Sequence, residues 1–383
     1  MSEQCEVDEF STTWTEKEIR QQPQCWMQAL AELEERRAEI DAFLAPVLAL
    51  PDLKVILTGA GSSAFIGDMI AGWLSAQSKH NIVSIATTDL VTNPLDYLQA
   101  EQPTLLVSFA RSGDSPESVA AVERVEQCVN NSFHLVITCN KEGSLCQKAL
   151  ISANAFTLLL PPQTHDRGFA MTSSITTMMV TALAVFAPAQ INRLTFEDVA
   201  DRCQQIIALQ ADFSEAVFGD LAYQRVIYLG SGGLRGTARE AALKVLELTA
   251  GKVAAFYDSP TGFRHGPKSL VDEHTLVVMF ISTQAYTRKY DLDLLNELRR
   301  DGQAMQIVPI IAQPCPLVEA GPHICLPPAR EFNDMEQMFC LLIYAQIFAL
   351  SQSIKAGIQP DTPSSSGTVN RVVQGVTIHP WEQ

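Results

Sequence analysis

The sequence predicts an α/β protein made of two tandem copies of a doubly wound, three-layer α/β/α domain with a parallel sheet. One observation is an internal repeat, because residues 55–61 (Val-Ile-Leu-Thr-Gly-Ala-Gly) return at 226–232 (Val-Ile-Tyr-Leu-Gly-Ser-Gly), an offset of 171 residues (226 − 55). The same offset relates 105–109 to 276–280. The other is that short apolar runs alternate with helical patterns, as in parallel strands joined by right-handed crossovers.

The first half is expected to begin with helices and continue as a sheet. Thr15 and Glu18 have the spacing of a capping box, so an arm of amphipathic helices is expected over 1–50, packed on the domain or on a partner subunit. Domain 1 follows at 51–195 and includes an apolar helix at 173–187 that is expected to be buried. Its expected strands are 54–58, 81–86, 104–109, 133–138 and 155–160.

A polar linker helix at 196–218 leads into domain 2, at 219–360. Its expected strands are 225–229, 253–256, 275–281, 306–311 and 323–326, followed by a long helix at 334–354. The C-terminal tail, 361–383, starts as a loop, but 372–378 is apolar enough that we expect it to be anchored.

The composition is that of a folded protein, with 47% hydrophobic and 18% charged residues among 383. We find no apolar run of the length that spans a bilayer, and the N-terminus is acidic, so a cytoplasmic protein is expected. Nine singly placed cysteines indicate reduced thiols without a disulfide framework or a zinc site. A net charge of −16 argues against nucleic acid as a partner, whereas a small phosphate could still be held by local N–H groups and hydroxyls.

Two serine-rich loops are candidates for holding an anion. The loops at 58–63 and 108–115 follow the first and third expected strands, and the carboxyl ends of neighbouring parallel strands lie together. Serines there often only cap helices, but two neighbouring loops favour a phosphate site formed by backbone N–H groups and hydroxyls. The candidate phosphate ligands are Gly61, Ser62, Ser63, Ser112, Gly113 and Ser115.

A nicotinamide enzyme is an alternative, because Gly59, Gly61 and Ala64 fit a dinucleotide fingerprint with Asp89 placed after the second strand. The match is short, its last position is Ala, and it leaves the serines after the third strand without a role.

Candidate proton-transfer groups lie in the second half. Lys244 and Glu247 share one face of an expected helix, and mostly apolar neighbours argue against the usual solvated ion pair. Glu247 beside a cation in a cleft would be a usable general base. His265 lies in a loop whose Gly and Pro residues restrain its backbone, although most loop histidines are simply exposed.

A further polar loop, 165–173, follows the last strand of the first domain. It begins with His165 and Asp166, and we expect it to have a binding role. Thr172 and Ser173 are its candidate substrate ligands.

These motifs, in this order, resemble the sugar isomerase (SIS) domain family, and the resemblance covers both copies, roughly 50 to 380. It rests on the first glycine loop, Arg-Ser-Gly-Asp-Ser at 111–115, Glu-Ala-Ala-Leu-Lys-Val-Leu-Glu at 240–247 and Arg-His-Gly-Pro at 264–267. Residues 164–177, 258–268 and 367–375 are most similar to the bacterial galactosamine-6-phosphate deaminase/isomerases within the family.

The resemblance implies roles for individual residues. Ser63, Ser112 and Ser115 would hold the phosphate, Glu247 would shuttle a proton between C2 and C1, and His265 would open the sugar ring, with Lys244 beside the base. The pattern departs at Gln374, where the related synthase has a lysine that forms a Schiff base.

The function implied is conversion of galactosamine 6-phosphate to tagatose 6-phosphate and ammonium, without cofactor or metal, by a homodimer or larger homo-oligomer. A plain ketose/aldose 6-phosphate isomerase and a non-catalytic sugar-phosphate sensor are the alternatives, because one fold serves several functions.

Overall fold

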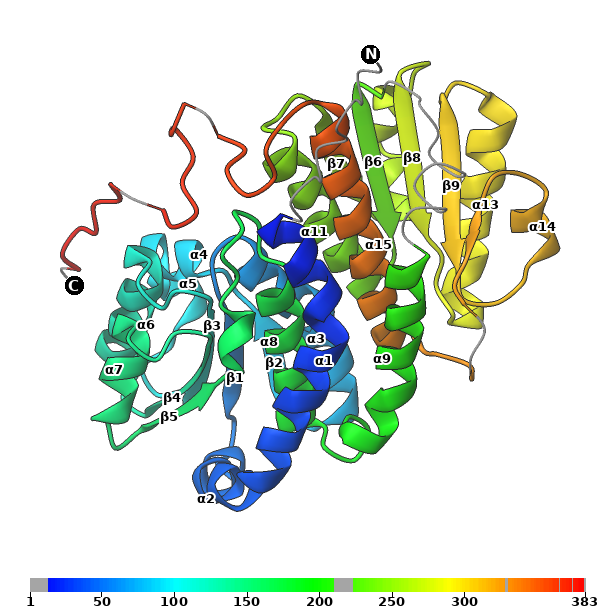
Figure 1. Cartoon of the computed structure of the whole chain (residues 1–383). Coiled ribbons are helices and arrows are strands. Elements are labelled where there is room, and N and C mark those ends of the chain that lie inside the picture. Colours follow the sequence, from blue (N-terminus) through cyan, green and yellow to red (C-terminus); the bar gives the residue numbers. More distant parts are fainter. Residues whose placement is uncertain (1–12, 210–222, 328–329, 365, 374, 382–383) are drawn as a thin grey trace, which may run out of the picture.

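The computed structural model describes residues 13–209, 223–327, 330–364, 366–373 and 375–381, which contain two parallel five-stranded sheets (Figure 1). The first has the strand order β2-β1-β3-β4-β5 and the second β10-β9-β8-β6-β7. Read from its other end, the second order repeats the first. The strands are β1 Lys54–Thr58, β2 Asn81–Ser84, β3 Thr104–Ala110, β4 Ser132–Thr138, β5 Ala155–Leu159, β6 Arg225–Gly230, β7 Ala254–Asp258, β8 Thr275–Phe280, β9 Gln306–Ile311 and β10 Ile324–Cys325.

The predicted fold class and all ten predicted strands are confirmed, with changes at the ends of some strands. The largest changes are at edge strands: β2 ends at Ser84, and β10 is only Ile324–Cys325. An edge strand has one neighbour instead of two, so fewer ladder hydrogen bonds hold its ends than hold those of a central strand.

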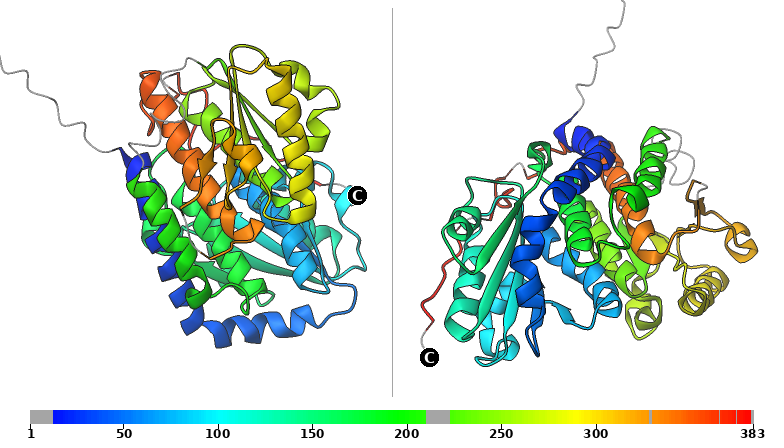
Figure 2. Two further views of the ribbon diagram at one scale, coloured as in Figure 1. Left: turned by 90° about the vertical axis from the view of Figure 1, so that its right-hand side faces the viewer. Right: turned by 90° about the horizontal axis from the view of Figure 1, so that it is seen from below.

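Helices from both copies fill the space between the sheets (Figure 1, Figure 2). These inner helices are α1 Trp14–Glu35, α3 Ser62–Gln77, α8 Ser173–Phe186, α9 Arg193–Ala208, α11 Gly233–Leu248 and α15 Asp334–Lys355, with α2 Arg37–Leu48 at one end. The outer face of the first sheet is covered by α4 Thr87–Thr92, α5 Pro94–Tyr97, α6 Pro116–Cys128 and α7 Ser144–Leu150. The outer face of the second is covered by α12 Pro260–Phe263, α13 Ala285–Asp301 and α14 Pro316–Glu319. Short 3-10 turns lie at η1 Pro162–Thr164 and η2 Pro267–Leu270.

The start of α1 differs from the prediction. Its N-cap is Thr13, whose Oγ1 accepts a hydrogen bond from the Glu16 N–H at 3.2 Å, so the capping box expected at Thr15 and Glu18 is wrong. Thr15 instead donates its hydroxyl to the Asp361 carboxylate at 2.8 Å. Glu18 accepts from the backbone N–H groups of the loop after β5, so these side chains fasten the arm to the rest of the chain.

Two apolar helices lie in the common core. The helix expected at 173–187 is α8, and its side chains are buried as predicted. The expectation that no apolar run could span a bilayer is wrong for α15, which is long and apolar enough by composition. However, 89% of its apolar window is buried inside the protein, so packing between the two copies explains its character.

The linker and the tail differ in part from expectation. The linker helix expected at 196–218 corresponds to α9, and residues 210–222 lie outside the described residues. Residues 372–378 form no helix or strand in the part that is described. The tail is held by Arg124, which donates to the His379 carbonyl at 2.7 Å, and by Trp381, which packs on the outer apolar cluster of domain 1.

The two copies meet through α3 and α11, which approach very closely. A Cβ atom at Gly236 would lie 2.7 Å from the backbone nitrogen of Met69, so only glycine permits this contact. An ion pair of 2.7 Å between Arg239 and Asp68 crosses the same contact. The approach carries one face of α11 to the loop that follows β1.

Candidate active site

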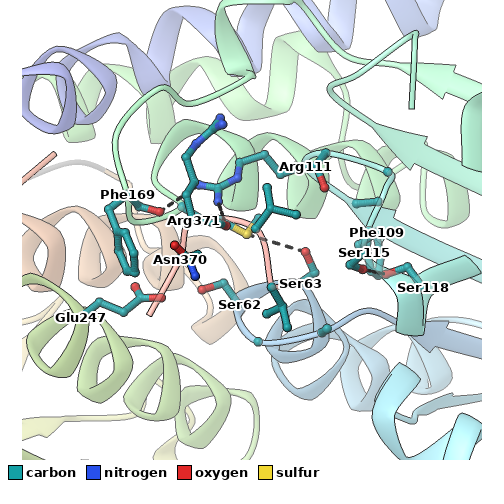
Figure 3. Close-up of a pocket in the computed structure, with 18 of the residues that line it drawn as sticks. Ser62, Ser63, Phe109, Arg111, Ser115, Ser118, Phe169, Glu247, Asn370 and Arg371 are labelled. Atoms are coloured by element: carbon teal, nitrogen blue, oxygen red, sulfur yellow. Dashed lines mark hydrogen bonds between the residues drawn. The ribbon is translucent and has the colours of Figure 1, made fainter. Parts of the chain in front are cut away.

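A cavity of about 230 Å³ lies at the carboxyl ends of β1 and β3 (Figure 3). This is the edge of a parallel sheet at which ligands bind in open α/β folds, where the strand order changes direction. Its walls come from the loops after β1, β3 and β5, from α11 and from the tail. The lining residues are Ala60, Gly61, Ser62, Ser63, Phe109, Ala110, Arg111, Ser112, Gly113, Ser115, Ser118, Phe169, Met171, Glu247, Val369, Asn370, Arg371, Val372 and Val373.

Two helix N-termini meet at the serine-lined end of this cavity. Gly61 caps α3 with φ 57° and ψ −131°, a conformation open to glycine, and leaves the first N–H groups of the helix near the cavity. Ser115 caps α6, and its hydroxyl donates to the Ser118 Oγ at 2.6 Å. Positive helix ends with neighbouring hydroxyls suit an anion such as phosphate.

An ion cluster on α11 lies beside this serine loop. The Lys244 ammonium is fully buried and lies 2.5 Å from Glu247 and 3.2 Å from Glu240. It also donates to the Ser62 Oγ at 3.0 Å, and that hydroxyl donates to Glu240 at 3.1 Å. Ser62 therefore joins the cluster to the anion loop, and Glu247, 23% exposed, is the member that lines the cavity.

Burial and charge determine the protonation of the cluster. Burial raises the pKa of Glu240 to about 7, against the opposing attraction of Lys244. Burial alone would lower the pKa of Lys244, but Glu240 and Glu247 together outweigh it, so the net pKa is raised and the ammonium stays charged. A permanent buried cation thus lies against the carboxylate that faces the cavity.

The structure brings seven predicted site residues to one cavity and leaves three away from it. Glu247 and the six predicted phosphate ligands line it, with Lys244 directly behind Glu247. His265 does not line it: it is exposed, in a loop held to α13 by ion pairs of Arg264 and Lys268 with Glu297. The imidazole is therefore not on the cavity of its own chain.

Thr172 and Ser173 also lie elsewhere. Both are fully buried, and their N–H and hydroxyl groups donate to the carboxylate of Asp166. Asp166 thus caps the start of α8 with its side chain. The same loop still reaches the cavity through Phe169 and Met171, whereas His165 is not among the lining residues.

Several residues that line the cavity were not predicted from the sequence. Ser118 lies one turn after Ser115, a spacing that could have revealed it. Arg111 is in the quoted Arg-Ser-Gly motif; it donates to the carbonyls of Phe169 at 3.1 Å and Arg371 at 2.7 Å and so fastens the tail over the cavity (Figure 3). Arg371 in turn donates to the Asp166 carbonyl. Gln374 lies outside the described residues.

The second copy fills the equivalent position with its own carboxylate. Gly232 has almost the backbone angles of Gly61, with φ 58° and ψ −128°, and the repeat offset carries Ser112 to Thr283 (112 + 171). Asp334 accepts from the Thr283 N–H at 2.6 Å and the Thr283 hydroxyl at 2.8 Å. In the second copy, the Asp334 carboxylate therefore accepts hydrogen bonds at Thr283, whose equivalent in the first copy, Ser112, lines the cavity. Among the described residues, no group of three or more His, Cys, Asp or Glu side chains could hold a metal ion.

Comparison with known proteins agrees with this architecture. The chain is 64% identical over 370 residues to the D-galactosamine-6-phosphate deaminase of Escherichia coli, covering 97% of this chain and 96% of that protein. It is 40% identical over 380 residues to the enzyme of the same name from a Shewanella species, covering 98% and 94%. A crystal structure of tagatose-6-phosphate ketose/aldose isomerase from E. coli superimposes with a TM-score of 0.92 at 60% identity, covering 97% of this chain and 98% of that one. Residues 51–188 and 222–356 both match the SIS domain model, and the chain belongs to the SIS domain family.

Proposed function

We propose that this protein is a cytoplasmic galactosamine-6-phosphate deaminase/isomerase that forms tagatose 6-phosphate and ammonium. The observation that carries the proposal is the arrangement of Glu247 in one cavity with two serine-lined helix N-termini. The names of the relatives supply the substrate and the reaction. Eight free cysteines among the described residues are consistent with a reducing compartment.

The phosphate is proposed to lie against Ser63, Ser112 and Ser115, which leaves the C1–C2 end of the open sugar near Glu247. Glu247 removes the C2 proton, which the C1 aldehyde acidifies, and returns it to C1. The resulting C2 imine is hydrolysed by water to a ketone and ammonium. Lys244 holds Glu247 in place through an ion pair of 2.5 Å.

Ring opening is proposed to use His265 of a second copy, because this side chain does not line the cavity of its own chain. This step requires a homo-oligomer. An equimolar mixture of His265→Ala and Glu247→Gln chains should then be more active than either variant alone, and a mixture without such a gain would contradict the shared site.

The test is ammonium release from a panel of hexosamine 6-phosphates. Glu247→Gln should lower turnover by about a hundred- to ten-thousand-fold while phosphate binding is kept, as expected when a general base is removed. Glu273→Gln, at a glutamate with an 82% exposed side chain, is the matched control. Unchanged ammonium release by Glu247→Gln would overturn the assignment. Plain isomerisation, which the name of the solved relative suggests, would give interconverted sugars without ammonium.

A further inference from the structure

A second cavity, of about 260 Å³, lies on the outer side of domain 1 between α6, α7, β4 and β5. Figure 1 shows α6 and α7 on the side of the first sheet that faces away from the second copy. The two cavities share no lining residue. His134 and Ala155 lie near the amino ends of β4 and β5, whereas the substrate cavity is at the carboxyl ends of the strands.

The histidine in its wall has no hydrogen-bond partner in the part of the chain that the structure describes. His134 is only 2% exposed, and neither ring nitrogen has a partner among the described residues. The nearest charged atom is a Glu126 carboxylate oxygen, 3.7 Å from Nε2, which is beyond hydrogen-bond distance. Burial lowers the pKa of His134 to about 4, so the ring is neutral at physiological pH and offers one donor and one acceptor.

The other residues that line the cavity determine which kind of molecule could bind beside the His134 ring. Six of the lining residues have apolar side chains: Val122, Val136, Leu145, Ala149, Ile151 and Ala155. The charged groups in the lining are Glu126 and Lys148, and the Lys148 ammonium is already 2.6 Å from Glu123. An anion would meet the Glu126 carboxylate without a free cation to balance it. A neutral, largely apolar molecule with one hydroxyl or N–H group is complementary to these walls.

We propose that this cavity is a second ligand site, which takes a compact, uncharged, largely apolar molecule hydrogen-bonded to His134 and acts on α6. Such a ligand would pair a buried imidazole that has no partner among the described residues. Val122 in its wall lies one helical turn after Ser118, which lines the substrate cavity from the first turn of the same helix. A shift of α6 would therefore move Ser118 at the proposed phosphate site.

Phenol and toluene form a matched pair of probes, because they have nearly the same shape and only phenol can hydrogen-bond. Titration of the full chain, followed by ligand-observed NMR, should give a dissociation constant about fivefold lower for phenol than for toluene, the value of one hydrogen bond. His134→Phe should lose this preference and bind toluene more tightly than phenol, because the phenol hydroxyl would then be buried without a partner. Ala149→Leu, which fills the cavity but keeps the histidine, should bind neither.

Equal binding of both probes to the unsubstituted protein, or binding of neither, would overturn the site. Phenol binding that appears only in Ile151→Asp would also overturn it, because the exposed Ile151 at the rim would then be covered by a second copy of the chain. Saturating phenol should change the affinity for inorganic phosphate at least twofold. An unchanged phosphate affinity would overturn the action on α6.

Discussion

Replacement of Glu240 by Gln should make the protein more stable than the unsubstituted chain at pH 8 but not at pH 5. The carboxyl group is fully buried between Lys244 and Ser62, and burial raises its pKa from 4.5 to about 7. Gln keeps the shape of the protonated acid and one oxygen that can accept from Lys244. The substitution therefore removes mainly the cost of ionising a buried carboxyl group.

The sign and size follow from the linkage of protonation to folding. The folded state holds the proton up to about pH 7, whereas the unfolded state releases it near pH 4.5. Stability contributed by this group is therefore lost as pH rises between these two values. The shift corresponds to about 3 kcal/mol, at 1.36 kcal/mol for each pH unit. Glu240→Gln lacks this loss, so its stability relative to the unsubstituted chain should rise by about 2.5 kcal/mol between pH 5, which already lies above 4.5, and pH 8.

Urea unfolding of both proteins at pH 5 and pH 8, followed by circular dichroism, measures this difference. Glu273→Gln is the control for replacing a solvated carboxylate, since its side chain is 82% exposed. A stability difference that is the same at both pH values would refute the reasoning. If the free energy of unfolding of Glu240→Gln falls relative to that of the unsubstituted chain between pH 5 and pH 8, Glu240 is needed as the ionised partner of Lys244.

Three further outcomes are expected. Gly236→Ala should lower the free energy of unfolding, measured by thermal unfolding, by about 1–3 kcal/mol and should also lower turnover, because its Cβ would press on the Met69 backbone. Gly72→Ala on α3 is the control, and it should not destabilise the protein because a Cβ there would lie in open space. Arg111→Ala should raise KM about tenfold and speed tryptic cleavage after Arg371, since it removes two charged hydrogen bonds that hold the tail; unchanged cleavage would contradict this role. Calorimetric titration with inorganic phosphate should give one site per chain, and two sites would show that Asp334 does not block the second copy.

The parts of the site set by local pattern could be predicted from the sequence. The repeat and the apolar runs identified the strands, and parallel strands bring the loops after β1 and β3 to one edge. Lys244 and Glu247 were recognisable by their helical spacing. These features depend on contacts within an element or between neighbouring strands.

The other parts depend on contacts between distant segments, for which local pattern carries no signal. The tail meets Arg111 across 260 residues of sequence. Its apolar stretch predicted that it would be anchored but did not indicate the partner that holds it. Thr172 and Ser173 are residue types that often bind phosphate. Their N–H and hydroxyl groups instead donate to Asp166, which lies six and seven residues earlier in the sequence. The position of His265 depends on how its loop packs on α13, which its Gly and Pro residues do not determine.

The duplicated fold creates two equivalent positions for a site. Each position consists of an anion loop and the helix face opposite it, and the two copies differ in both. Since α3 and α11 are repeat equivalents packed against each other, each helix presents a face toward the anion loop of the opposite copy. On α11 that face carries Glu240, Lys244 and Glu247; the offset of 171 places Met69, Trp73 and Ala76 at the same positions of α3. At these three described positions of α3 the second anion loop therefore faces no base or cation, and Asp334 already accepts hydrogen bonds from the donors of that loop. The lack of an acid–base cluster at these positions of α3 and the closure of the second loop by Asp334 are consistent with each other, because a phosphate held there would have no such cluster to act on its sugar.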